Sequence, residues 1–115
     1  MSSAALFDTV RSVAFGSITA SYTPLGLPFG HATRILHFIN DTNGTYMLSD
    51  DGINDKVPVL DNGFTLYDVT SDQDANEKLR FSEGTQWYIK YLSVPTLQAN
   101  SSNTFYLTTI YGKGE

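Results

Sequence analysis

Turn-forming residue pairs interrupt this chain so often that only short strands fit between them. The pairs that close tight turns most readily are Asn43-Gly44, Asp51-Gly52 and Asn62-Gly63. Longer loops are predicted over residues 24–30 and 95–103, where Pro, Gly and Asn gather. The intervening segments are rich in Val, Ile, Thr, Phe and Tyr and show no sustained helical period. The pattern therefore predicts an all-β fold, a single antiparallel β-sandwich of the jelly-roll type with about seven strands.

The predicted strands span residues 13–23, 32–39, 45–49, 57–60, 64–70, 86–92 and 104–111. The first strand changes its alternation at Gly16-Ser17, as a β-bulge does. Residues 32–39 are apolar in both phases, which indicates a central strand buried on both faces or between two layers. Pro58 indicates an edge strand. For Asn43-Gly44 we expect a hairpin between two paired strands, with a positive φ at Gly44.

The N-terminus is predicted to be a short arm over residues 1–12, ahead of a sandwich domain over residues 13–115. Residues 3–11 are the one helix candidate, with Ser3 as a possible cap. The arm is too apolar for a tail that is merely soluble. Because the sandwich has strands enough without it, we expect deletion of residues 1–10 to leave a folded protein that binds its partner more weakly.

Charge and composition exclude several classes of partner. The 115 residues suit one domain and carry a formal charge of −5, with seven Lys and Arg scattered along the chain. Nucleic acids and anionic membranes favour clustered basic residues, so neither is expected as a partner. No apolar run approaches the ~20 residues that span a bilayer. The start of the chain lacks the basic and apolar regions of a secretory signal, so we expect synthesis in the cytosol.

The residues that carry catalysis or bind metals are sparse. Cysteine is absent and no serine lies in a Gly-x-Ser-x-Gly motif. His31 and His37 are isolated, and His37 is interpreted as a packed strand residue. The acidic segment 50–55 resembles a calcium loop only loosely, because it lacks the EF-hand order, and a solvated loop with Asx-turns is expected. No catalytic, cofactor or metal site is predicted, and the chain is not expected to be an enzyme.

The aromatic residues favour contact with proteins. Charged residues make up 17% of the chain, and fourteen of its fifteen aromatic residues are Phe or Tyr. Tyr buries a large area while keeping a hydroxyl for hydrogen bonding, which suits protein interfaces. Trp87 alternates with Ile89 and Tyr91, and an exposed row of that kind would stack on sugars. Burial in the core is the favoured interpretation of Trp87.

Several short motifs follow one another along almost the whole chain. They are Gly16–Tyr22, Arg34–Leu36, Asn40–Thr42, Leu48–Gly52, Val57-Pro58, Phe64–Thr70, Glu83–Lys90 and Phe105–Gly112. In this order they resemble a set of small virion proteins of tailed bacteriophages, over about residues 13–112. The resemblance implies a β-sandwich in the virion, as a capsid cement or decoration protein or as a part of the neck or tail. It implies no active site.

The leading hypothesis is therefore a capsid decoration protein that binds the major capsid protein, stabilises the shell and forms a homo-oligomer, a dimer or a trimer. It would be synthesised in the bacterial cytoplasm and located in the virion. The residues predicted to bind the partner are Leu6, Phe7 and Val10 in the arm and Leu25, Leu27 and Phe29 in the following loop. A neck, tail or head-fibre component is the first alternative. A carbohydrate-binding module that uses Trp87 is the second.

Overall fold

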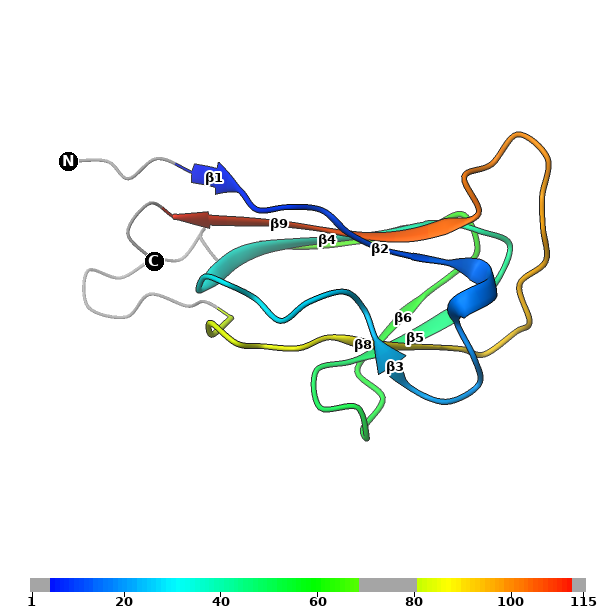
Figure 1. The fold of residues 1–115 in the computed structure, drawn as a ribbon, viewed down its shortest axis with the longest axis horizontal. Coiled ribbons are helices and arrows are strands. Elements are labelled where there is room, and N and C mark those ends of the chain that lie inside the picture. The colour runs from blue at the N-terminus through cyan, green and yellow to red at the C-terminus, as the bar shows by residue number, and fades with distance from the viewer. Residues whose placement is uncertain (1–4, 69–80, 113–115) are drawn as a thin grey trace.

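The computed structural model describes residues 5–68 and 81–112, which form two antiparallel sheets packed face to face (Figure 1). The strands are β1 (Ala5–Phe7), β2 (Arg11–Ala14), β3 (Thr23–Pro24), β4 (Thr33–Asp41), β5 (Tyr46–Ser49), β6 (Val57–Val59), β7 (Phe64–Asp68), β8 (Tyr88–Tyr91) and β9 (Thr104–Gly112). The predicted all-β sandwich is confirmed. The predicted ends at residues 69–70 and the polar segment 71–80 lie outside the described residues.

The strand order is that of a jelly roll. Sheet A has the order β1-β9-β4-β7, with β2 also paired with β9, and sheet B has the order β3-β8-β5-β6. β1 and β2 lie one after the other along β9, so sheet A, like sheet B, is four strands wide. The chain passes to the other sheet at every connection except β1–β2 and β5–β6, which is jelly-roll connectivity.

The core lies between the sheets and takes alternate residues from each strand. Leu36 and Phe38 of β4 face it from sheet A, and Tyr46 and Leu48 of β5 face it from sheet B, all of them fully buried. Trp87 is also buried, and its ring meets that of Phe38 edge to face at 5.1 Å between centroids. The expected core position of Trp87 is therefore confirmed.

The first predicted strand is wrong, because the chain changes sheet within it. β2 ends at a 3-10 turn over Phe15–Ser17, and the chain then crosses to sheet B, where β3 begins at Thr23. Between them, Thr19 turns the backbone locally, because its hydroxyl donates to the Ser21 carbonyl at 3.0 Å and accepts from the Ser21 amide at 3.2 Å. Such local hydrogen bonds compete with a strand ladder, so alternation over residues 17–23 did not produce a strand.

The expected hairpin at Asn43-Gly44 is also wrong. The turn joins β4 of sheet A to β5 of sheet B, so the strands that it connects are not paired. The glycines with positive φ in the described chain are Gly26, Gly52 and Gly84, and Gly44 is not among them. The side chain of Asn40 shapes the turn instead: its Nδ2 donates to the Gly44 carbonyl at 2.7 Å, and its Oδ1 accepts from the Thr42 amide at 3.1 Å.

The helix candidate over residues 3–11 is wrong in its described part, which forms strands, whereas the division into an arm and a sandwich domain stays a prediction. Ala5–Phe7 and Arg11–Ala14 both pair antiparallel with β9 and belong to sheet A. A helix this short is marginal in water, whereas the edge of β9 supplies hydrogen-bond partners. The pairing register with β9 differs by one residue between β1 and β2, so the edge strand is irregular at residues 8–10.

The other turn and edge predictions agree with the structure. β6 contains Pro58 and pairs with β5, and it ends the order of sheet B. Asn62 has φ of 52°, and the Gly63 amide donates to the Leu60 carbonyl at 3.0 Å, which closes the predicted turn. β4 is central in sheet A as predicted, although its outward side chains are only half-buried.

Candidate partner-binding surfaces

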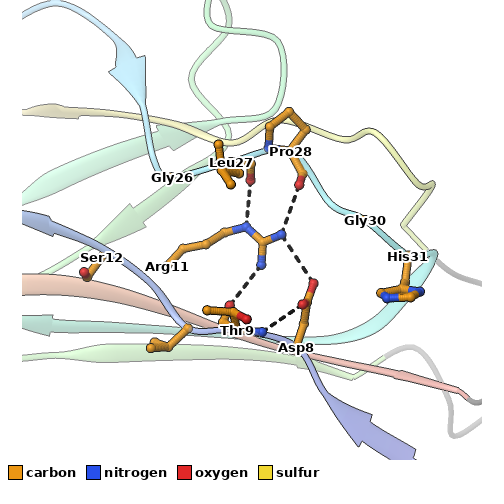
Figure 2. Close-up of a pocket in the computed structure, with 10 residues that line it drawn as sticks. Asp8, Thr9, Arg11, Ser12, Gly26, Leu27, Pro28, Gly30 and His31 are labelled. Carbon is orange, nitrogen blue, oxygen red and sulfur yellow. Dashed lines mark hydrogen bonds and ion pairs between the residues drawn. The ribbon is translucent and has the colours of Figure 1, made fainter.

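A hollow of about 450 Å³ lies between the N-terminal edge of sheet A and the loop that leads into β4 (Figure 2). We call it the edge hollow. It is lined by Asp8, Thr9, Val10, Arg11, Ser12, Gly26, Leu27, Pro28, Gly30 and His31. The two predicted partner-binding segments, which are separate in the sequence, thus lie on opposite sides of one hollow.

Arg11 joins the two sides of the edge hollow (Figure 2). Its residue opposes Leu107 of β9, so its side chain starts on the inward face of sheet A. The Nε atom donates to the Leu27 carbonyl at 2.7 Å, and Nη2 donates to the Pro28 carbonyl at 3.0 Å. The guanidinium also lies 5.1 Å from the ring centroid of Phe29. Arg11 therefore fastens the loop to the edge strand.

The remaining donors of Arg11 are directed at the protein as well. Nη1 reaches the Thr9 carbonyl and the Thr109 hydroxyl, each at 3.4 Å, and Nη2 forms an ion pair with Asp8 at 3.4 Å. The side chain is only 9% exposed. A guanidinium has five N–H donors, so this one has none left over for an external anion. The role of Arg11 in the hollow is to position the loop.

The structure divides the predicted partner-binding residues into two groups. Leu25 and Phe29 are buried in the core, at 0% and 2% exposed, so neither presents a surface to a partner. This corrects the expectation from the sequence: the amides of Leu25 and Phe29 donate to the carbonyls of Trp87 and Thr85 at 2.8 and 2.9 Å, and both side chains pack into the core. Leu27 and Val10, at 77% and 52% exposed, line the edge hollow.

Leu6 and Phe7 point to different sides of sheet A. Leu6 opposes Tyr111, whose ring stacks on that of His31 at 3.8 Å, so it lies beside the edge hollow. Phe7 opposes Ile110 on the outward face of the sheet and is 74% exposed. Leu6 can extend the apolar rim of Val10 and Leu27, whereas Phe7 belongs to a second surface.

That second surface is the outward face of sheet A, which we call the outer face. Its apolar and uncharged side chains, set by the pairing register, include Phe7, Ser12, Ile35, His37, Ile39, Phe64, Leu66, Tyr106, Thr108 and Ile110, and the carboxylates of Asp41 and Asp68 lie at its ends. Phe64 and Leu66 are 70% and 55% exposed. Sequence reasoning did not assign this surface a role, although the apolar character of both phases over residues 32–39 was its signal.

The acidic loop between β5 and β6 holds itself together through Asp51. Its Oδ1 accepts from the Ser49 hydroxyl at 2.6 Å and from the amides of Ile53 and Asn54 at 2.8 Å. These hydrogen bonds, led by that of Ser49, hold the pKa of Asp51 well below its ordinary value. The predicted Asx-turn is confirmed. Within residues 5–68 and 81–112, no three His, Cys, Asp or Glu side chains converge as a metal site would require.

A polar cluster on sheet B is likewise closed on itself. The Tyr22 hydroxyl donates to Asp55 at 2.6 Å, Lys90 pairs with the same carboxylate at 3.2 Å, and its Nζ lies 4.6 Å from the Tyr22 ring centroid. Burial and the hydrogen bond to Asp55 raise the pKa of Tyr22, which keeps its hydroxyl protonated. The arrangement ties neighbouring loops together and offers no activated nucleophile.

Comparisons of the chain with family models, curated proteins and solved structures find no match. None of the helices in the described part of the chain is long and apolar enough to cross a membrane. The edge hollow, which carries the exposed apolar side chains of Val10 and Leu27, and the outer face, which carries Phe7, Phe64 and Leu66, are the two candidate surfaces from which a function can be argued.

Proposed function

We propose that this chain is a virion structural protein of a tailed bacteriophage, a decoration protein that binds the major capsid protein and stabilises the shell. The observation that carries the proposal is the pairing of Val10 and Leu27 across the edge hollow. Both side chains are exposed; Leu27 belongs to the loop that Arg11 contacts, and Val10 lies between β1 and β2, which both pair with β9. An exposed apolar pair on a rigid frame is suited to binding another protein surface.

The apolar rim of the edge hollow, formed by Val10 and Leu27, can bind a partner with little loss of conformational entropy. β1 and β2 are held by β9, and the loop is held by Arg11, so a partner would not have to immobilise either segment. Complete burial of Val10 and of Leu27 is worth ~1.5–3 kcal/mol each. This is a small gain for one copy, and attachment to a shell would rely on many copies acting together.

Two further observations support the virion role. The motif order along residues 13–112 resembles small phage virion proteins. Jelly rolls occur in viral capsid proteins and also in lectins. The fold is therefore compatible with the proposal but does not distinguish a protein that binds the capsid from one that binds glycans. The burial of Trp87 removes the exposed aromatic row on which glycan binding was predicted to depend. A neck, tail or head-fibre position remains the alternative, and copy number per particle separates it from a decoration role.

The test measures attachment to particles of the chain's own phage that lack it. The double variant Val10→Ser/Leu27→Ser changes only exposed side chains of the rim, so the fold should be kept. The matched control is Ile53→Ser/Leu97→Ser, two equally exposed apolar residues elsewhere. We expect the parent and the control to co-sediment with particles and the rim variant to bind at least about 10-fold more weakly.

Two results would count against the proposal. A rim variant that binds as tightly as the parent removes the edge hollow from the attachment site. A parent protein that neither occurs in purified particles nor binds to stripped ones removes the virion role itself.

A further inference from the structure

We propose that the outer face of sheet A is an interface between two copies of this chain, related by a twofold axis. The face is flanked by the most exposed apolar side chains of sheet A, Phe7 on one edge strand and Phe64 on the other. Between them, β4 and β9 contribute half-buried residues rather than the charged ones usual on a solvated sheet face. An exposed apolar patch of this kind is typical of a protein–protein contact.

The distribution of charge favours a second copy as the occupant. A twofold contact places the patch against itself, so a charge near the axis meets its own copy. Among the outward side chains that the pairing register places on β4, β7 and β9, the charged residues are Asp41 and Asp68, at opposite ends of the face, and the half-buried Arg34 lies in the bulge at the Asp68 end. Its middle, around His37, Leu66 and Thr108, carries no acidic or lysine side chain. The formal charge of −5 is thus no obstacle to self-association here.

The size of the face suits a small symmetric interface. Four strand positions at about 4.8 Å spacing and seven residues of β9 at about 3.3 Å each give a planar extent of about 19 by 23 Å. Because side chains project from the sheet, the accessible area of the face is larger than this planar area and approaches the ~600 Å² per partner at the lower end of specific interfaces. Two sheets stacked face to face at ~10 Å would bury the exposed parts of Phe64 and Leu66.

The face also has relief of its own that could interlock with a copy of itself. A hollow of about 380 Å³ lies beside Phe64 and is lined further by Ile39, Asn40, Asp41, Asn62, Gly63 and Tyr106. The Phe64 ring packs edge to face against the imidazole of His37, with 5.6 Å between the centroids, which restrains the ring beside this hollow. In a twofold contact, an exposed aromatic ring and a neighbouring hollow of one copy can meet the hollow and the ring of the other.

The apolar side chains of the edge hollow, Val10 and Leu27, are different from the exposed apolar side chains of the outer face, Phe7, Phe64 and Leu66. A dimer would then present two attachment rims, which raises avidity for a repetitive shell. The dimer itself depends on the outer face alone, so it can be tested in solution without any particle.

Sedimentation velocity over a range of protein concentrations tests the proposal. We expect the parent to form a dimer at micromolar concentration. Leu66→Lys places a charge in the contact and should weaken dimerisation by roughly 30-fold or more, while the monomer should still fold because Leu66 is exposed in it. Phe64→Ser is the second variant, should the lysine disturb the fold. Ile53→Lys, at a residue 80% exposed on another surface, should dimerise like the parent.

The possible outcomes separate this inference from the proposed function. A parent that stays monomeric to its solubility limit, or a folded Leu66→Lys variant that dimerises as the parent does, overturns the dimer. A monomeric parent whose particle binding is lost in Leu66→Lys would assign the outer face to the shell instead, and this also overturns the dimer. A dimeric parent that does not bind particles would leave the dimer standing and remove the virion role.

Discussion

The Arg11 Nε donates a hydrogen bond of 2.7 Å to the carbonyl oxygen of Leu27, sixteen residues further along the chain. This bond links the first edge of sheet A to the loop that carries the chain from sheet B into β4. The loop backbone can approach Arg11 so closely because residue 26 is glycine. A Cβ at residue 26 would lie 2.8 Å from the Cβ of Arg11, and the φ of Gly26 is +69°, in the left-handed region that favours glycine. With its carbonyl turned inward, Leu27 exposes its side chain at the edge hollow.

Arg11→Met should destabilise the fold by about 2–4 kcal/mol, since hydrogen bonds to charged groups contribute more than neutral ones. Methionine keeps the length of the side chain but removes its donors, which leaves the carbonyls of Leu27 and Pro28 without their partner. Urea unfolding monitored by Trp87 fluorescence measures the loss. Lys56→Met is the control, because Lys56 forms an exposed pair with Asp50 at 3.4 Å that is worth ~0–1 kcal/mol. Equal effects in the two variants would show that Arg11 does not hold the loop.

Gly44→Ala should cost about 1–3 kcal/mol through crowding rather than through backbone strain. A Cβ at residue 44 would lie 2.9 Å from the Cβ of Pro95 and 3.2 Å from the carbonyl oxygen of Ser93. Gly16→Ala is the matched control, because a Cβ there meets no atom within 4 Å. Thermal unfolding of both variants measures the difference. A Gly44→Ala protein as stable as Gly16→Ala would mean that the 93–95 segment moves aside at little cost.

The fold class could be predicted from the sequence because turn chemistry and strand alternation are local. Pro58 lies in an edge strand as expected, because proline lacks the N–H that a central strand must donate, and Asn62-Gly63 forms the expected turn through its own conformational preference. The pairing of strands is not local. Asn43-Gly44 was predicted to close a hairpin, but the Asn40 side chain directs the turn across to the other sheet. The residue pair Asn43-Gly44 alone does not indicate which sheet the next strand joins.

The candidate surfaces show the same division. Exposed Val10 and Leu27 were among the predicted residues, but their meeting depends on Arg11, whose buried position has no sequence signal. Burial of Leu25 and Phe29 was missed because a loop with two prolines gives no alternation to follow. The pairing of β1 with β9 also argues that deletion of residues 1–10 removes part of sheet A, although the expectation of a folded truncated protein stays a prediction.

Asp51→Asn should lower the melting temperature at neutral pH, with a difference from the parent that shrinks in acid. The folded state holds the pKa of Asp51 below its ordinary value, through hydrogen bonds from Ser49, Ile53 and Asn54. A group whose pKa is lowered on folding stabilises the protein above its unfolded pKa and loses that contribution as the pH falls through the folded value. The gap between parent and variant should therefore hold at pH 7 and narrow below about pH 4.

Melting curves from pH 7 to strongly acidic conditions measure that gap. Asp61→Asn is the control, because Asp61 lies in another exposed turn and the described residues show no such set of hydrogen bonds to it. If the Asp51→Asn gap stays constant through the acid range, the carboxylate charge is not what stabilises the turn.

Trp87→Phe should be far milder than is usual for a buried tryptophan. The Nε1 atom of Trp87 is buried and has no hydrogen-bond acceptor in the described part of the chain. Phenylalanine removes this unsatisfied donor and keeps an aromatic ring against Phe38, so the loss of volume is partly offset. We expect a loss of about 1 kcal/mol or less, against about 3–5 kcal/mol for Trp87→Ala, which also leaves a cavity. Urea unfolding monitored by circular dichroism compares the two variants. A Trp87→Phe loss as large as that of alanine would mean that the indole N–H makes a stabilising contact in solution.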